Sequence, residues 1–141
     1  MRQVPPHPVW IGHAGDGRDF RALLDANIQA VVQLALEEPP LQPPRELICC
    51  RFPLVDGEGN SPTVLALAAT TIAQLLRRAV PTLVCCGNGM SRAPALAAAG
   101  LALLLGEKPE SCLLQVLGEH GGDVSPALWN EVRLVVEASA G

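Results

Sequence analysis

The 141-residue chain has few aromatic residues and little positive charge. It contains no tyrosine, two phenylalanines and two tryptophans, and Lys108 is its single lysine. The formal net charge is −4. Nucleic acids and anionic membranes attract surfaces with an excess of lysine and arginine, and unpaired bases stack on aromatic side chains. We therefore expect neither a nucleic-acid partner nor a membrane partner.

The cysteines do not form the pattern of a secreted or zinc-binding domain. Their number is odd, four of them form two adjacent pairs, and no C-x-x-C motif with histidine spacing occurs. The first ten residues, MRQVPPHPVW, lack the apolar core of a signal peptide. The longest apolar run, 93–105, is shorter than the ~20 residues that cross a bilayer. We expect a soluble cytoplasmic protein in a reducing compartment. The five cysteines are Cys49, Cys50, Cys85, Cys86 and Cys112.

Apolar segments of strand and helix type alternate along the chain. The length and a hydrophobic content of 49% predict one globular domain over residues 1–141. Alternation of strands and helices favours an α/β fold with a central, mostly parallel, four- to five-stranded sheet flanked by helices. Strands are expected at 9–12, 28–36, 47–55 and 83–85. Helices are expected from Asp16 or Asp19 to about 27, from 62 to about 78, at 92–105, at 109–117 and from 126 to about 138, with a loop at 13–17.

Residues 84–94, VCCGNGMSRAP, combine a short strand, a glycine-containing loop and the start of a helix. Ligands of open α/β sheets bind at the carboxyl ends of strands, where helix N-termini attract anions. Gly87 and Gly89 allow successive N–H groups to converge, and Arg92 can bind two oxygens of an anion. The same electrostatic field favours the thiolate form of Cys86. The alternative is a tight turn with Cys86 as a small buried residue and Arg92 in solvent.

The segment CGNGMSR at 86–92 resembles the C-x5-R signature loop of the cysteine-dependent protein tyrosine phosphatases. Its G-x-S-R end is typical of the dual-specificity branch. The segments VWIG at 9–12, IQAVVQLA and SPALWNEVRLV also match the family's order of elements. The resemblance implies a phosphotyrosine phosphatase-like fold and a single catalytic domain over 1–141. The implied substrate is a phosphorylated protein or a small phosphomonoester, and we expect the protein to be a monomer.

The resemblance also implies a role for each residue of the loop. Cys86 would attack phosphorus and form a phosphocysteine. The side chain of Arg92 and the N–H groups of the loop would bind the phosphoryl oxygens, with no metal or cofactor. An aspartate some thirty residues upstream would act as general acid, which identifies Asp56, directly after the strand at 47–55, with Glu58 as the fallback. The residues whose N–H groups would bind phosphate are Gly87, Asn88, Gly89, Met90, Ser91 and Arg92, and Ser91 would also order the loop by hydrogen bonding within it.

Two positions depart from the family pattern. Cys85 stands where the family usually has histidine, and Ala93 stands where it usually has serine or threonine to help expel the thiolate. These departures predict slow hydrolysis of the phosphocysteine. They also leave open a catalytically weak phosphate-binding module. A sulfurtransferase is a third reading, but it gives Asp56 no role.

The second cysteine pair, Cys49-Cys50, has two interpretations. We expect its strand to neighbour the strand that carries Cys85 and Cys86. A cysteine of these pairs could then trap oxidised Cys86 in a disulfide. Packing in the core is the favoured interpretation, because free cysteines are often buried.

Overall fold

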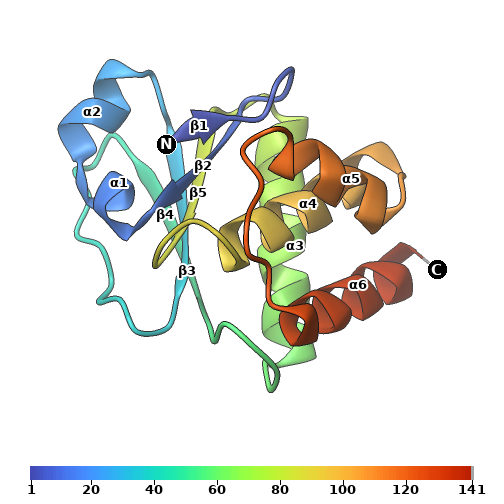
Figure 1. Ribbon diagram of the computed structural model, residues 1–141. Helices are drawn as coiled ribbons and strands as arrows, with labels where there is room; N and C mark the ends of the chain where they lie inside the picture. The colour runs from blue at the N-terminus through green and yellow to red at the C-terminus, as the bar shows by residue number, and fades with distance from the viewer. Residues whose placement is uncertain (141) are drawn as a thin grey trace.

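The computed structural model describes residues 1–140 and contains one five-stranded sheet in the order β1-β2-β5-β3-β4 (Figure 1). The outer strand β1 is antiparallel to β2, and the other neighbouring strands are parallel. The predicted α/β fold with a mostly parallel sheet is therefore confirmed. The strands are β1 (Arg2–Gln3), β2 (Val9–His13), β3 (Ala30–Ala35), β4 (Ile48–Leu54) and β5 (Thr82–Cys86).

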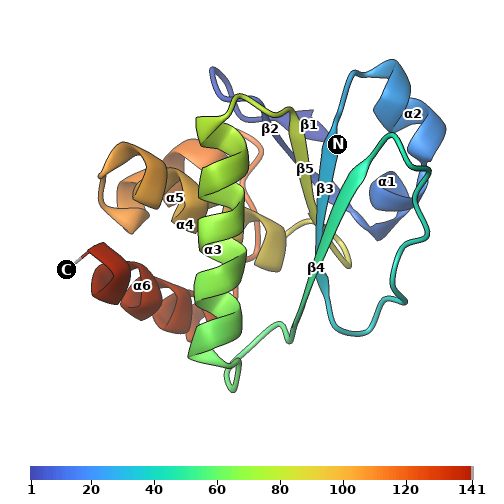
Figure 2. The same ribbon diagram turned by 180° about the vertical axis from the view of Figure 1, so that it is seen from behind.

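Helices cover both faces of the sheet. Two short helices, α1 (Ala14–Arg18) and α2 (Phe20–Asp25), lie on one face, and four longer helices lie on the other (Figures 1 and 2). No helix within residues 1–140 has the length and apolar character needed to cross a membrane. The longer helices are α3 (Pro62–Arg77), α4 (Arg92–Leu105), α5 (Pro109–Leu117) and α6 (Pro126–Ala140).

The sheet separates two hydrophobic cores. The larger core lies between the sheet and α3, α4, α5 and α6, and the smaller lies between the sheet and α1 and α2. Cys86 belongs to the larger core and Cys85 to the smaller. This arrangement follows from the alternation of side chains along β5, and it directs consecutive cysteines to opposite faces of the sheet.

Helix α4 is the central helix of the larger core. Its residues from Arg92 to Ala102 are all buried, as expected for a helix that is apolar on every side. A side chain at Gly100 would collide with Ile72 of α3, so the glycine allows the two helices to pack closely. Since Arg92 begins this helix, close packing also fixes the position of the arginine.

Two elements differ from the sequence-based expectation. Residues 13–17 were expected to be a loop, but α1 occupies 14–18. His13 starts it: its Nδ1 accepts from the N–H of Asp16 at 3.3 Å, and the Asp16 carboxylate accepts from the N–H of His13 at 3.0 Å. This reciprocal cap has the geometry of a capping box with an unusual N-cap residue. Strand β1 was not expected, and only its pairing with β2 makes it a strand.

Candidate active site

The loop from Cys86 to Arg92, called here the cysteine loop, connects β5 to α4 at the carboxyl end of the sheet. Gly89 has a φ of +76°, and a Cβ there would lie 2.9 Å from the carbonyl oxygen of Gly12. Only glycine meets both conditions without strain. The carbonyl of Gly87 accepts from Ala14 at 3.1 Å, and the Asn88 side chain accepts from the N–H of Met90 at 2.9 Å. The cysteine loop is therefore fixed by a hydrogen bond to α1 and by a hydrogen bond within the loop.

The thiol of Cys86 lies at the N-terminus of α4. Its residue is 2% exposed, and the N–H of Ala93 donates to Sγ at 3.4 Å. The first turn of a helix presents unpaired N–H groups and the positive end of the helix dipole. The sulfur of Cys86 therefore lies where backbone donors gather at the start of a helix.

Arg92 is buried beside the cysteine and is held by Glu37. Its Nη1 and Nη2 donate to the two Glu37 oxygens at 2.7 and 2.5 Å, and Nη1 also donates to the carbonyl of Leu54 at 2.8 Å. The guanidinium lies next to Gly87, where a Cβ would be 3.3 Å from Nη2. Nε is buried and has no hydrogen-bond partner among the described residues. An unpaired buried donor is costly, and this N–H is available to an acceptor beside Cys86.

Glu37 is a site residue that the sequence interpretation missed. The hydrogen bonds from Arg92 lower the pKa of the Glu37 carboxyl to about 2, against a smaller opposing effect of burial. Glu37 lies in the turn that follows β3, and β3 is the neighbour of β5. Its place in the segment EEPPLQPP suggested only a proline-rich connector. The signal available in the sequence was a carboxylate just after a buried strand, and without the strand order it could not be assigned to Arg92.

Asp56 lies against the cysteine loop, two residues after the end of β4. The hydroxyl of Ser91 donates to Asp56 Oδ1 at 2.5 Å and accepts from the N–H of Ser125 at 2.9 Å. The sequence interpretation expected Ser91 to hydrogen-bond within its own loop. Its hydroxyl instead bonds to two other segments, at Asp56 and Ser125. The structure brings Asp56, Cys86 and Arg92 to one edge of the sheet, which is where the sequence interpretation placed them.

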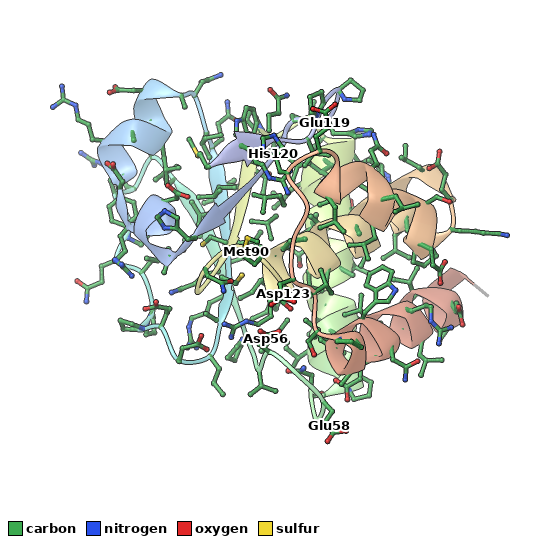
Figure 3. All side chains as sticks on the ribbon, in the orientation of Figure 1. Asp56, Glu58, Met90, Glu119, His120 and Asp123 are labelled. Carbon is green, nitrogen blue, oxygen red and sulfur yellow. The ribbon has the colours of Figure 1, made fainter. Side chains whose placement is uncertain are left out.

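The other labelled carboxylates lie differently around the site (Figure 3). Glu58, the fallback acid, is at the tip of its loop and far from Met90, whereas Asp56 is close to Met90 in this view. The N–H of Asp123 donates to the carbonyl of Met90 at 2.8 Å. Gly122 beside it leaves no room for a side chain, because a Cβ would lie 3.0 Å from the same carbonyl. The segment before α6 thus supports the cysteine loop through its backbone, a contact that the sequence did not indicate.

The two departures from the family pattern, Cys85 and Ala93, place no charged and no hydroxyl side chain directly before Cys86 or directly after Arg92. Burial raises the pKa of the Cys85 thiol to about 12, so this neighbour stays neutral. Cys85 packs on Gly17, where a Cβ would lie 2.8 Å from its Sγ. Ala93 is fully buried and provides only its N–H to Cys86.

The expectation that the two cysteine-bearing strands are neighbours is wrong. Strand β3 lies between β4, with Cys49 and Cys50, and β5, with Cys85 and Cys86. Strands lie ~4.8 Å apart, so β4 and β5 are ~10 Å apart, beyond the ~4.4–6.8 Å between Cα atoms that a disulfide requires. A disulfide from Cys49 or Cys50 to Cys86 is therefore not compatible with this strand order. Both residues are half-buried and belong to neither hydrophobic core, so the expected packing in the core is not observed either. Within residues 1–140, no three histidine, cysteine or acidic side chains gather as metal ligands.

No protein-family model and no curated protein sequence matches the chain, but solved structures do. Human DUSP28 is 21% identical, with a TM-score of 0.84 over 99% of this chain and 97% of that one. A mouse putative dual specificity phosphatase complexed with zinc tungstate is 22% identical, with a TM-score of 0.83 over 96% and 86% of the two chains. The human tyrosine phosphatase-like serine/threonine/tyrosine-interacting protein is 14% identical, with a TM-score of 0.81 over 100% and 98%. The chain therefore has the fold of the dual-specificity phosphatases.

Proposed function

We propose that this chain is a phosphatase that hydrolyses phosphomonoesters through a phosphocysteine intermediate, with residues 1–141 as its catalytic domain. The observation that carries the proposal is the unpaired, buried Nε of Arg92 beside the thiol of Cys86. A phosphoryl group in the cysteine loop would accept from this donor and from the loop N–H groups of Gly87, Asn88, Gly89, Met90, Ser91 and Arg92.

The first chemical step transfers the phosphoryl group to sulfur. The Cys86 thiolate attacks phosphorus, so that an S–P bond forms while the P–O ester bond breaks. Asp56 gives its proton to the leaving oxygen, which departs as an alcohol or phenol. Arg92 and the loop N–H groups stabilise the charge on the three equatorial oxygens in the transition state.

The second step returns the enzyme to its starting state. The Asp56 carboxylate takes a proton from water as the water oxygen attacks phosphorus. The S–P bond breaks, inorganic phosphate leaves and the Cys86 thiolate is restored. Residue 93 has no hydroxyl to stabilise the negative charge of the leaving sulfur. The N–H of Ala93, at 3.4 Å from Sγ, stabilises that charge instead.

Glu37 would prepare Arg92 for both steps. Two parallel hydrogen bonds from a carboxylate fix the plane of a guanidinium. Nη1 donates to Glu37 and Leu54, and Nη2 donates one hydrogen bond to Glu37. The N–H of Nε is left for the phosphoryl oxygens.

The substrate that fits is a phosphotyrosine, phosphoserine or phosphothreonine protein, or a small aryl phosphate. The cysteine loop has no lysine and no arginine besides Arg92, and it therefore lacks the extra positive charge that a phosphoinositide headgroup would require. All five cysteines are free thiols, which supports a reducing compartment such as the cytoplasm. We propose that the protein acts there as a monomer.

A catalytically weak phosphate-binding module is the second candidate, favoured by the absence of a hydroxyl at Ala93 and by the neutral Cys85. The similar human structure that is described as a tyrosine phosphatase-like interacting protein is in keeping with this candidate. In such a module, Arg92 and the loop would bind a phosphorylated side chain and the phosphoryl group would remain in place.

One experiment separates these candidates. Hydrolysis of an aryl phosphate is measured for the wild type, Cys86→Ser and Asp56→Ala, together with binding of a phosphopeptide. The phosphatase predicts turnover by the wild type, none by Cys86→Ser and a large loss in Asp56→Ala. If the wild type is as inert as Cys86→Ser while both bind the phosphopeptide, the chain is a binding module. If neither activity nor binding is found, both proposals are wrong.

A further inference from the structure

The loop that carries Asp56 is closed by the side chain of Asn60. We call residues 55–60 the aspartate loop. Asn60 Oδ1 accepts from the N–H of Val55 at 2.9 Å, and Nδ2 donates to the carbonyls of Val55 and Gly57, both at 3.1 Å. The two ends of the loop are therefore joined, and Asp56 lies inside the turn that they define.

Glu131 of α6 binds the same loop from a distant part of the chain. Its Oε2 accepts from the N–H of Gly59 at 2.8 Å, and its Oε1 accepts from the N–H and Nδ2 of Asn60 at 3.2 and 3.4 Å. Gly59 has a φ of +93°, a conformation that glycine adopts easily and that helps consecutive N–H groups converge on one anion. One carboxylate thus binds two consecutive backbone amides and the side chain that closes the loop.

The aspartate loop has few other attachments. Val55, Asp56, Glu58 and Gly59 are exposed, so apolar packing contributes little to their position. The contacts that hold it to the rest of the molecule are the Ser91 hydroxyl at Asp56 and the Glu131 carboxylate at the far end. An exposed loop of this kind opens at low free-energy cost unless such hydrogen bonds are present.

We infer that Glu131 is a positioning residue for proton transfer by Asp56. This inference rests on the proposed phosphatase function. Glu131 does not touch the reacting atoms; it acts through Gly59 and Asn60 by keeping the aspartate loop closed, so that Asp56 stays beside the cysteine loop. Without it, Asp56 spends less time where the leaving oxygen would be.

A loss of positioning has a signature that a general loss of structure lacks. A phenol of ordinary acidity, with a pKa of about 10 as in tyrosine, needs a proton when it leaves phosphorus. A dinitrophenol leaves readily as its anion and does not. In Glu131→Ala, we expect the burst rate with phenyl phosphate to fall ~10- to 100-fold, within the ~10²–10⁴-fold that a general acid contributes. The burst rate with 2,4-dinitrophenyl phosphate should change less than about twofold.

Two further variants make the test specific. Glu131→Gln keeps the shape and one acceptor oxygen, so it should recover part of the phenyl phosphate rate. Glu137→Ala is the matched control, because Glu137 lies on the same helix and pairs with Arg133 at 2.9 Å rather than with the aspartate loop. Amide hydrogen exchange at Gly59 and Asn60 should rise in Glu131→Ala and stay unchanged in Glu137→Ala.

Each other outcome overturns a stated part of the inference. An equal loss with both esters in Glu131→Ala would show that the residue is only structural. Unchanged burst rates, or unchanged exchange at Gly59 and Asn60, would show that it does not hold the loop. If the wild type hydrolyses neither ester, the proposed function fails and the catalytic role of Glu131 fails with it, while the exchange rates still decide whether the carboxylate holds the loop.

Discussion

The carboxylate of Glu37 holds the guanidinium of Arg92 through two hydrogen bonds, 2.7 Å from Nη1 and 2.5 Å from Nη2. The pair joins the end of β3 to the start of α4, two segments that are 55 residues apart. It leaves Nε without a partner. The ion pair therefore orients the guanidinium but leaves the Nε donor unbound. The effect of Glu37 on phosphate binding can thus be measured by replacing Glu37.

Glu37→Ala should weaken the binding of orthovanadate or inorganic phosphate. Charge-assisted hydrogen bonds contribute ~1.5–3 kcal/mol when they are shielded. The Glu37 side chain is 59% exposed, so solvent reduces the effect and we expect about a tenfold loss of affinity. Isothermal titration calorimetry measures it. Glu38→Ala is the control, because Glu38 pairs with Arg18 instead; equal affinities in both variants would contradict the orienting role.

The same pair should make stability depend on pH in acid. The Arg92 hydrogen bonds lower the pKa of Glu37 from 4.5 to about 2 in the folded protein. A lowered pKa means that the contribution to stability is complete above pH 4.5 and is lost as pH falls toward 2. In urea unfolding over this range, the wild type should lose stability more steeply than Glu37→Gln. Parallel curves for the two proteins would show that the carboxylate contributes nothing.

Ser91→Ala should destabilise the protein and reduce its activity with poor leaving groups. The substitution leaves the partly buried N–H of Ser125 without its acceptor and releases Asp56. A fully buried donor without a partner costs ~1–3 kcal/mol, so we expect a loss of about 1 kcal/mol here, which urea unfolding measures directly. Ser61→Ala is a useful comparison, because the Ser61 hydroxyl caps α3 at an exposed position and does not contact Asp56. A phenyl phosphate rate that falls equally in both variants would contradict the link between Ser91 and Asp56.

Local patterns predicted the parts of the site that depend on consecutive residues. A strand, two glycines and a helix start predicted that Cys86 and Arg92 lie together at the carboxyl end of the sheet, and the family resemblance identified Asp56 after the preceding strand of the chain. Glu37 and Glu131 depend on the order of the strands and on the packing of α6, and neither follows from local sequence. The same limit produced the wrong expectation for Cys49 and Cys50, since β3 enters the sheet between β4 and β5. Helix α1 was missed because histidine is an unusual N-cap and two of its residues are glycines.

Alkylation should distinguish Cys86 from the other thiols. Burial raises the pKa of Cys85 to about 12 and that of Cys112 to about 11, and it also raises the pKa values of Cys49 and Cys50. These thiols are therefore protonated near neutral pH and react slowly. Brief treatment with iodoacetamide followed by peptide mass spectrometry should find the label on Cys86, and orthovanadate should prevent it. Labelling of the half-exposed Cys49 or Cys50 before Cys86 would contradict the proposed role of Cys86 as the nucleophile.

Ala93→Ser should accelerate the second chemical step. Among residues 1–140, the N–H of Ala93 donates to Sγ of Cys86, at 3.4 Å. A hydroxyl on residue 93 can add a second donor to the departing thiolate. Removing one such donor from a preorganised site costs ~10²–10³-fold in rate, and introducing one at an unoptimised position should give about a tenfold gain. In rapid-quench experiments with an aryl phosphate, the wild type should show a burst of phenol followed by a slow steady state.

The variant should keep the amplitude of that burst and raise the steady-state rate. Thermal unfolding of Ala93→Ser serves as the control for packing, because residue 93 is fully buried and the hydroxyl must fit beside the cysteine. A linear progress curve for the wild type from the first turnover would show that hydrolysis of the phosphocysteine does not limit the reaction. A burst whose steady state is unchanged in the variant would show that expulsion of sulfur is not the slow part of that hydrolysis, and that attack by the water activated by Asp56 limits it instead.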